Sequence, residues 1–260
     1  MPTQWTAAIQ NLMAGFVYTP PEPDPEVVFD VPGEWEATVE PALDLLGAHH
    51  LLHPDVMSRG NMKIAKNTLI FNLPPVKTCP NNASCKATCY AVPSYRLRYG
   101  VRRKYDSNYK LAKENIEELA GLIVRQLEVE DCEIVRLHSS GDFFSQAYVD
   151  MWTAIAEAFP KIRFYTYTKA DKILDFSNID ALKNFNLIRS MIDGHLNYGS
   201  EEYLARMKKK YPKAYICPAT RGKDVHCGKE CKYCVTGNMP LFKLHGTNRK
   251  AGPLPEQKYY

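Results

Sequence analysis

Hydrophobic residues recur with two alternating periods between residues 107 and 210. Residues 107–127 carry apolar side chains at every third or fourth position, which predicts an amphipathic helix. Residues 133–138 and 162–168 are short runs rich in β-branched and aromatic residues, as in strands. The same series predicts further elements at residues 145–159, 179–184, 187–192 and 201–210. Strands that alternate with helices indicate βαβ units and a parallel sheet, so the predicted fold class is α/β.

The chain before this series has a different character. Residues 4–16 have the spacing of a short amphipathic helix, and the proline-rich residues 18–25 cannot continue it. After a second helical segment at 41–52, a short strand at 68–73 is stopped by two prolines. We therefore divide the chain into a helical and Pro-rich arm (1–57), an α/β core (58–212) and a cysteine-rich segment (213–260).

Net charge, the length of apolar runs and the number of cysteines limit the classes of protein to which this chain can belong. The 260 residues carry a net charge of +4, which permits an anionic or nucleic-acid partner without requiring one. No apolar run approaches the roughly 20 residues that span a bilayer, and the N-terminal residues lack the basic region of a signal peptide. We therefore expect a cytoplasmic protein without a membrane partner. Because disulfides are rare there, eight cysteines favour metal binding.

The first cysteine group comprises Cys79, Cys85 and Cys89, with five and three residues between them. A loop of this kind lets three thiolates converge and leaves one coordination position for another ligand. A histidine there would complete a zinc site, whereas a [4Fe-4S] cluster would keep one open iron that can bind a small molecule. The spacing fits neither common zinc pattern well and favours the iron–sulfur cluster.

The second cysteine group comprises Cys217, Cys227, Cys231 and Cys234. Four thiolates close a coordination site, which suits either structural zinc or an electron-transferring cluster, and the spacing does not separate the two. Cys132 stands alone before a strand. We interpret it as a small, buried apolar residue.

Polar residues follow the predicted strands at their carboxyl ends, where parallel sheets bind ligands. The residues expected to act in proton transfer or positioning are His138, Asp142 and His195. The residues expected to hold a cofactor are Ser139, Ser140, Gly141, Asp142, Thr168 and Asp193. These residues also have purely structural alternatives. The histidines can be hydrogen-bonded core residues, and residues 139–142 can be a strand-to-helix turn that needs Gly and Asp for its geometry.

A basic run interleaved with tyrosines lies between the first cysteine group and the predicted helix. It contains Arg96, Arg98, Arg102, Arg103 and Lys104, with Tyr95, Tyr99 and Tyr105 between them. Such a run can meet phosphates and stack on bases, or it can simply be the solvated face of a helix. It supports an alternative function, a non-catalytic zinc- or cluster-binding protein that engages nucleic acid.

Two resemblances add to these patterns. Residues 61–91, with their Phe-Asn-Leu-Pro-Pro and Thr-Cys-Pro motifs, and the C-terminal cysteine pattern resemble the phage "gene product 88" family. That resemblance covers roughly residues 58–246. It implies a viral or mobile-element origin, hence the host cytoplasm, and little about activity.

The order of elements also resembles the radical SAM enzymes, which have a strand, a three-cysteine loop and then alternating helices and strands. This resemblance implies a partial (β/α)6 barrel with a cysteine-rich extension. It further implies an open-iron [4Fe-4S] cluster that binds S-adenosylmethionine, a second cluster, an electron donor, and a turn at 139–142 that contacts the methionyl amino group. The loop departs from the family, because its gaps are five and three residues and Tyr90 follows the last cysteine.

We therefore expect an iron–sulfur enzyme whose substrate the sequence does not name. The small-molecule ligand at the open iron is either S-adenosylmethionine or a substrate that binds the iron directly.

Overall fold

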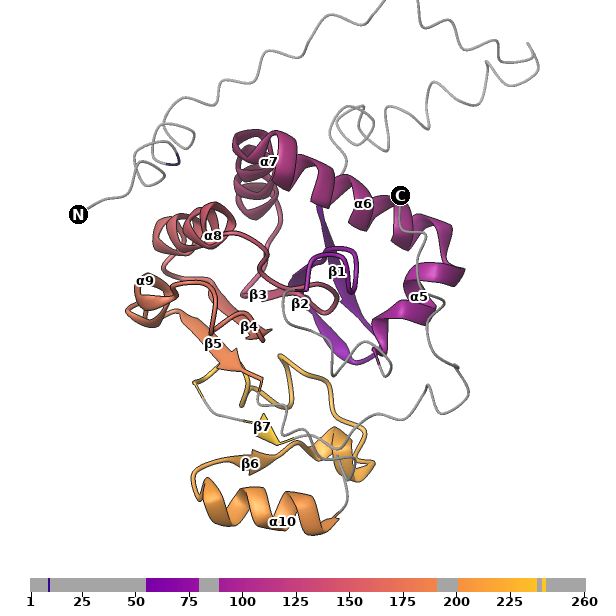
Figure 1. Ribbon diagram of the computed structural model, residues 1–260, viewed down its shortest axis with the longest axis vertical. Coiled ribbons are helices and arrows are strands. Elements are labelled where there is room, and N and C mark those ends of the chain that lie inside the picture. Colours follow the sequence, from indigo (N-terminus) through magenta and orange to yellow (C-terminus); the bar gives the residue numbers. More distant parts are fainter. Residues whose placement is uncertain (1–8, 10–54, 80–88, 191–200, 238–239, 242–260) are drawn as a thin grey trace, which may run out of the picture.

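A five-stranded sheet forms the centre of the computed structural model, which describes residues 9, 55–79, 89–190, 201–237 and 240–241. Its strands are β1 (Met57–Asn61), β2 (Ile64–Phe71), β3 (Ile134–Leu137), β4 (Arg163–Thr168) and β5 (Phe185–Arg189). They lie side by side in the order of the sequence (Figure 1). The first two form an antiparallel hairpin, and β2 to β5 are parallel. The described strands form an open sheet with β1 and β5 at its edges, and they do not close into a barrel.

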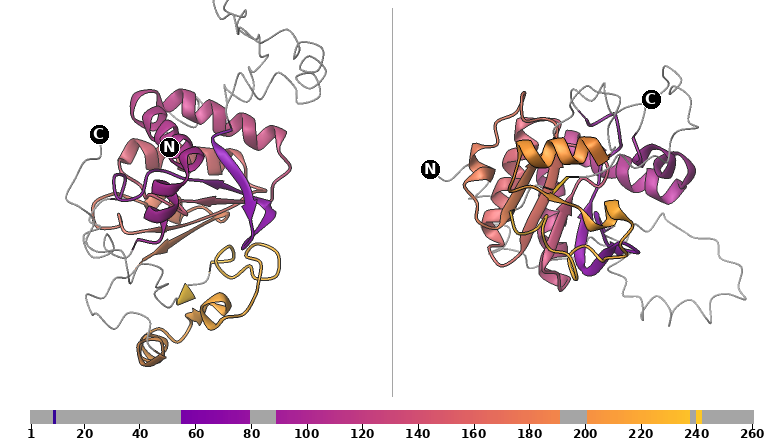
Figure 2. Two further views of the ribbon diagram at one scale, coloured as in Figure 1. Left: turned by 90° about the vertical axis from the view of Figure 1, so that its right-hand side faces the viewer. Right: turned by 90° about the horizontal axis from the view of Figure 1, so that it is seen from below.

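Helices cover one face of this sheet. They are α5 (Ala91–Leu97), α6 (Tyr99–Glu114), α7 (Ile116–Val129), α8 (Gln146–Ala158) and the short α9 (Ser177–Asp180). Because the parallel strands follow one another without a reversal of order, right-handed crossovers place the connecting helices on a single face. Figure 2 shows these helices on one side of the sheet and the C-terminal segment on the other.

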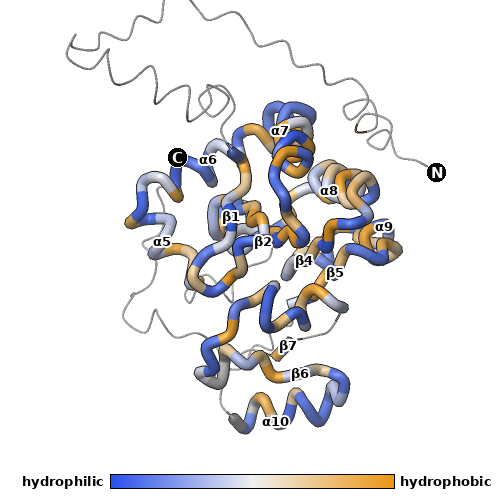
Figure 3. The backbone as a smooth tube through the Cα atoms, turned by 180° about the vertical axis from the view of Figure 1, so that it is seen from behind, coloured by the Kyte–Doolittle hydropathy of each residue, from blue (hydrophilic) through white to orange (hydrophobic). Residues whose placement is uncertain are grey.

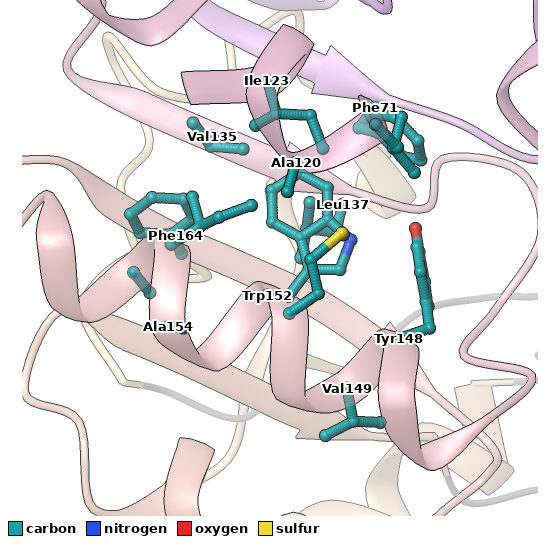
Figure 4. Close-up of a cluster of buried hydrophobic side chains, with 14 of the residues drawn as sticks. Phe71, Ala120, Ile123, Val135, Leu137, Tyr148, Val149, Trp152, Ala154 and Phe164 are labelled. Atoms are coloured by element: carbon teal, nitrogen blue, oxygen red, sulfur yellow. The ribbon is translucent and has the colours of Figure 1, made fainter. Parts of the chain in front are cut away.

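The core lies between the sheet and its helices. Alternate strand residues such as Phe71, Val135, Leu137 and Phe164 point towards the helices and are completely buried. The indole of Trp152 on α8 sits among these side chains, as Figure 4 shows. This interface is the main hydrophobic core of the described chain. It holds in place the sheet whose strand ends carry the polar residues.

The opposite face of the sheet is covered by the C-terminal segment instead of by helices. Ile134 and Tyr165 pack there against Val235 of the C-terminal segment. Gly228 comes so close that an added Cβ would lie 2.9 Å from Thr68 Oγ1 and 3.2 Å from Ile134 Cδ1. Its φ of +92° is also a conformation that favours glycine. The cysteine-rich segment is therefore seated directly on the sheet.

The remainder of the C-terminal segment forms a small unit of its own. It consists of α10 (Glu201–Lys210), a 3-10 turn (Pro218–Arg221) and the two-residue parallel strands β6 (Tyr215–Ile216) and β7 (Pro240–Leu241). Leu204 and Met207 of α10 pack against Ala214 and Leu241. The rest of α10 is rich in hydrophilic residues (Figure 3). Within the described ranges, no helix combines the length and the apolar character needed to cross a membrane.

The predicted series of elements is largely confirmed. The helix at 145–159 is α8, and its N-cap is Ser145, whose hydroxyl accepts a hydrogen bond from Tyr148 N at 3.3 Å. The predicted single helix at 107–127 is wrong, because Asn115 interrupts it and caps α7 by accepting from Glu118 N at 3.3 Å. The strand predicted at 68–73 begins earlier, at Ile64, and the sequence reading missed its partner β1.

Little of the predicted N-terminal arm can be compared with the structure. Ile9 is fully buried and joins the main core, while residues 1–8 and 10–54 lie outside the described residues. The last two residues of the strand predicted at 187–192 lie outside them as well.

Candidate metal and ligand site

Cys227 and Cys231 are held on the sheet by backbone hydrogen bonds. Cys227 N donates to Lys63 O, and Ala65 N donates to Cys227 O, both at 2.9 Å. This pairing makes a parallel bridge to the first residue of β2, Ile64. Gly228 N then donates to Cys231 O at 2.9 Å and closes a tight turn. The two cysteines are thus fixed to the sheet and to each other by main-chain contacts.

The other two cysteines of the second group reach the same place. The hydroxyl of Tyr215 lies 3.0 Å from Cys234 Sγ, and Asn186 Nδ2 donates to Cys234 O at 2.6 Å. Cys217, which follows β6, is buried, and its N–H donates to Leu241 O at 2.9 Å. Sequence alone placed these cysteines in one group, and the structure brings them onto one face of the sheet.

The four thiols of the second group lie within electrostatic range of one another. Burial raises the pKa of the Cys227 thiol, and the negative charges of Cys234, Cys217 and Cys231 raise it further. Burial also raises the pKa of Cys234, while hydrogen bonds from Tyr167 and Tyr215 lower it. As they stand, no three His, Cys, Asp or Glu side chains in the described part of the chain form a group that could hold a metal ion.

Two members of the first cysteine group, Cys79 and Cys89, are described, and both follow β2 in the chain. Cys79 ends the stretch that follows the strand, and Cys89 lies two residues before α5 begins. Cys85 lies outside the described residues, so the three-cysteine site stays a prediction. Tyr90, the residue after Cys89, lies at the carboxyl end of β3, because its hydroxyl donates to Ser139 O. Parallel sheets bind ligands at this end.

The turn at 139–142 is clamped to the stretch that leads to Cys79. Ser140 N donates to Asn72 Oδ1, and Ser140 Oγ donates to Leu73 O, both at 2.9 Å. Gly141 has a φ of +84°, and an added Cβ would lie 2.6 Å from Thr78 Oγ1. Ser140 and Gly141 therefore hold the end of β3 against the approach to the first cysteine group.

Asp142 and Thr168, both predicted to hold a cofactor, contact each other. Thr168 Oγ1 donates to Asp142 Oδ1, and Lys169 N donates to Oδ2, both at 2.8 Å. Phe143 N adds a third hydrogen bond at 2.8 Å to Oδ1. Burial raises the pKa of this carboxyl group, and the three hydrogen bonds oppose that shift. As placed, the carboxylate joins the ends of β3 and β4.

His138 faces the helices. Its Nε2 lies 3.0 Å from the Tyr148 hydroxyl, and its ring meets Phe143 edge-on. Burial lowers the pKa of His138 to about 3, so the imidazole is neutral near pH 7. Its φ of +60° turns the chain at the end of β3. The two other predicted residues, Asp193 and His195, lie outside the described residues.

Arg136 is a site residue that the sequence reading missed. It lies on β3 on the open face, with its Cζ 5.8 Å from the ring centroids of both Tyr165 and Tyr167. Burial works against its charge, while Tyr165, Tyr90, Tyr167 and Cys227 raise its pKa. The signal in the sequence was one arginine inside an otherwise apolar strand.

The basic run spans two helices rather than one. Arg96 ends α5 together with Leu97, and Arg102 and Arg103 lie near the start of α6. These arginines are exposed, and Arg102 lies over the exposed ring of Tyr99 at 5.8 Å. Lys104 differs, because its Nζ turns inward and donates to Met57 O at 3.0 Å.

Comparison with known proteins places both cysteine groups inside a recognised family region. The family model described as Gene product 88 matches residues 55–252. The chain is 23% identical over 203 residues to the "Gene 88 protein" of Mycobacterium phage D29, an alignment covering 66% of this chain and 83% of that protein. It is 26% identical over 202 residues to the "Gene 88 protein" of Mycobacterium phage L5, with the same two shares covered. No solved structure shows a significant match.

Proposed function

The chain belongs to the gene product 88 family of phage proteins, and from its geometry we propose that it is an iron–sulfur protein. The observation that carries the proposal is the position of the C-terminal cysteines: backbone hydrogen bonds hold Cys227 and Cys231 on the open face of the sheet, Cys234 packs there beside Tyr165, and Cys217 lies within electrostatic range of Cys227. The cytoplasm of the infected host, where thiols stay reduced, is a suitable place for such a protein.

The residues at this face fit an anionic, thiolate-bound centre. Cys217, Cys227, Cys231 and Cys234 would supply four sulfur ligands, the usual set for an iron–sulfur cluster. The positive charge of Arg136 favours the thiolate form of Cys227 and Cys234. The Tyr215 hydroxyl beside Cys234 Sγ is the kind of neighbour that orients a metal ligand. A cluster here would supply electron transfer, whereas zinc on the same ligands would supply stability alone.

We further propose that Cys79, Cys85 and Cys89 hold a cluster with an open iron that takes a small ligand. The position of Tyr90, the residue after Cys89, at the carboxyl end of β3 supports this. The sequential parallel strands with helices on one face are compatible with part of a radical-SAM-like barrel, of which the described strands form an open sheet. Support for S-adenosylmethionine itself is weaker, since three protein donors already occupy the Asp142 carboxylate.

Metal analysis of the full chain purified without oxygen tests the main proposal. We expect iron and acid-labile sulfide together with a broad visible absorption. Cys231→Ser should remove part of the iron, because Cys231 belongs to the proposed ligand set. Cys132→Ser is the matched control, since this thiol packs beside the helix-side core, and it should keep the full iron content. A colourless protein that carries zinc and no labile sulfide would refute the cluster.

A second experiment separates the two cysteine groups. Cys85→Ala should lose iron without losing the share that depends on Cys231, because the two sets are distinct. Formation of 5′-deoxyadenosine from S-adenosylmethionine under strong reductant then tests the finer proposal. A protein with clusters but no such product, and no spectral response to S-adenosylmethionine, would keep the iron–sulfur proposal and lose its radical chemistry.

Nucleic-acid binding is a second candidate function, favoured by the exposed arginines around Tyr99. Replacing Arg102 and Arg103 with Glu should abolish binding of single-stranded DNA, measured by fluorescence anisotropy. The affinity of the unmodified protein should fall steeply as salt is added, because phosphate contacts release counterions. Binding that is unchanged in this double variant would exclude the surface.

A further inference from the structure

Two buried polar atoms near the end of β3 lack a hydrogen-bond partner. They are Nε of Arg136 and Oγ of Ser139, which lie three residues apart in the chain. Buried polar groups in folded proteins are nearly always paired, with protein groups or with something bound. Two unpaired donors at the same end of one strand are consistent with an occupant that no described side chain supplies.

Tyr90 connects the two unpaired groups. Its hydroxyl donates to the Ser139 carbonyl oxygen, and its phenol lies within electrostatic range of the Arg136 guanidinium. The side of Tyr90 away from these contacts is open to solvent, since the residue is 55% exposed. Tyr90 is therefore the exposed residue of this group, and its side chain separates the two donors from solvent.

The guanidinium has no acidic partner. Its neighbours are the rings of Tyr165 and Tyr167 and the thiol of Cys227. In the part of the chain that the structure describes, no carboxylate forms an ion pair with it. A partly buried guanidinium that lacks a carboxylate partner favours the binding of an anion there.

We propose that Arg136 and Ser139 form a binding site for the oxyanion of a small ligand, a carboxylate or a phosphate. Nε–H and the serine hydroxyl both donate, and one oxyanion can accept from both. Negatively charged thiolates would balance the positive charge of Arg136, but they would leave the Ser139 hydroxyl without a hydrogen-bond partner. An oxyanion accounts for both groups. The site also lies at the carboxyl end of a parallel strand, where such folds bind their ligands.

This proposal does not depend on the metal, because neither residue is among the proposed metal ligands. Thermal unfolding of the full chain as purified, with its metal content measured, tests the proposal. The probes are inorganic phosphate, acetate and chloride at equal ionic strength. A bound anion stabilises the folded state by mass action, so we expect a saturable rise of Tm with phosphate or acetate and none with chloride. The probe that gives the larger rise identifies the kind of oxyanion.

Variants then assign the effect to the two residues. Arg136→Met should abolish the anion-dependent rise, because it removes the charged donor and keeps an apolar side chain of similar length beside Tyr165 and Tyr167. Ser139→Ala should weaken the response about tenfold in apparent affinity through the loss of one donor. Arg163→Met is the control, since this arginine lies on the neighbouring strand and is exposed, and it should respond like the unmodified protein.

Three results would overturn the site. The first is an identical Tm in phosphate, acetate and chloride. The second is an equal loss of response in Arg163→Met, which would show general anion binding by the surface. The third is an unmodified protein whose Tm does not respond to phosphate or acetate, combined with faster loss of metal to a chelator in Arg136→Met. That third result would assign Arg136 to the thiolates alone and would leave the iron–sulfur proposal standing.

Discussion

The two faces of the central sheet differ in what covers them and in what they contain. The face under α7 and α8 is filled by apolar side chains such as those of Trp152 and Phe164. The other face carries Arg136 and two tyrosines, and an irregular cysteine-rich segment covers it. One face supplies the apolar core, and the other carries the cysteine-rich segment for which we propose metal binding. Strand alternation makes this division possible, since successive residues point to opposite sides.

Trp152→Ala tests the helix face and should have the largest effect. The indole is completely buried, so its removal leaves a cavity that we expect to cost about 3–5 kcal/mol of unfolding free energy. Denaturant unfolding measures this loss. Leu97→Ala, at a residue that is 83% exposed, should change the free energy by less than about 0.5 kcal/mol. Comparable losses in the two variants would mean that the helix face is not the main core.

The pH dependence of stability tests whether the helix face is dry around His138. Burial lowers the pKa of His138 to about 3, so between that value and about 6.5 the unfolded chain binds the proton more readily. Above about pH 6.5, neutral His138 makes its full contribution to the free energy of unfolding. That contribution is lost as the pH falls towards 3, by up to about 1.4 kcal/mol per pH unit. Urea unfolding at several pH values measures the slope.

His138→Asn supplies the comparison for that slope. Asparagine tolerates the positive φ at this position and does not titrate, so the variant should lose the His138 contribution. Asp142 acts in the opposite direction, because burial raises its pKa and the folded chain holds that proton more strongly. A slope that is unchanged in His138→Asn would show that the imidazole is accessible to water.

Gly228→Ala tests the seating of the C-terminal segment on the open face. The new Cβ would meet Thr68 and Ile134, so we expect a loss of about 1–3 kcal/mol and faster release of bound metal to a chelator. Gly237→Ala is the matched control, because Gly237 has a similar φ of +88° and nothing within 4 Å of an added Cβ. Equal effects in the two variants would assign the loss to backbone strain rather than to close packing.

Two asparagines give the smallest and most selective comparison. Asn186→Ala removes the hydrogen bond to the Cys234 carbonyl on the open face, and Asn115→Ala removes the cap of α7. Each should cost about 1 kcal/mol in denaturant unfolding. Only Asn186→Ala should also speed metal release. The same release rate in both variants would mean that the hydrogen bond to Cys234 does not position its thiol.

Sequence reasoning predicted the elements whose signals are local. The apolar spacing of α8, its Ser145 cap and the β-branched runs of β3 and β4 each lie within one segment, so they can be read without knowing the neighbours. The hairpin strand β1 was not predicted, because Ser58, Arg59 and Gly60 lack the β-branched and aromatic side chains typical of strands. It is held by pairing with β2 and by contacts such as that of Met57 N with Gln126 Oε1 at 2.9 Å.

For this protein, the sequence by itself determined the α/β class, the family and the grouping of the cysteines, since spacing and periodicity are properties of the chain. The tertiary structure alone decided which polar residues meet. It placed the second cysteine group on the open face, turned His138 towards the helices and occupied Asp142 with three hydrogen bonds. It also placed Arg136 near Tyr90. These outcomes depend on contacts between residues far apart in the chain, whose burial and charge no local pattern records.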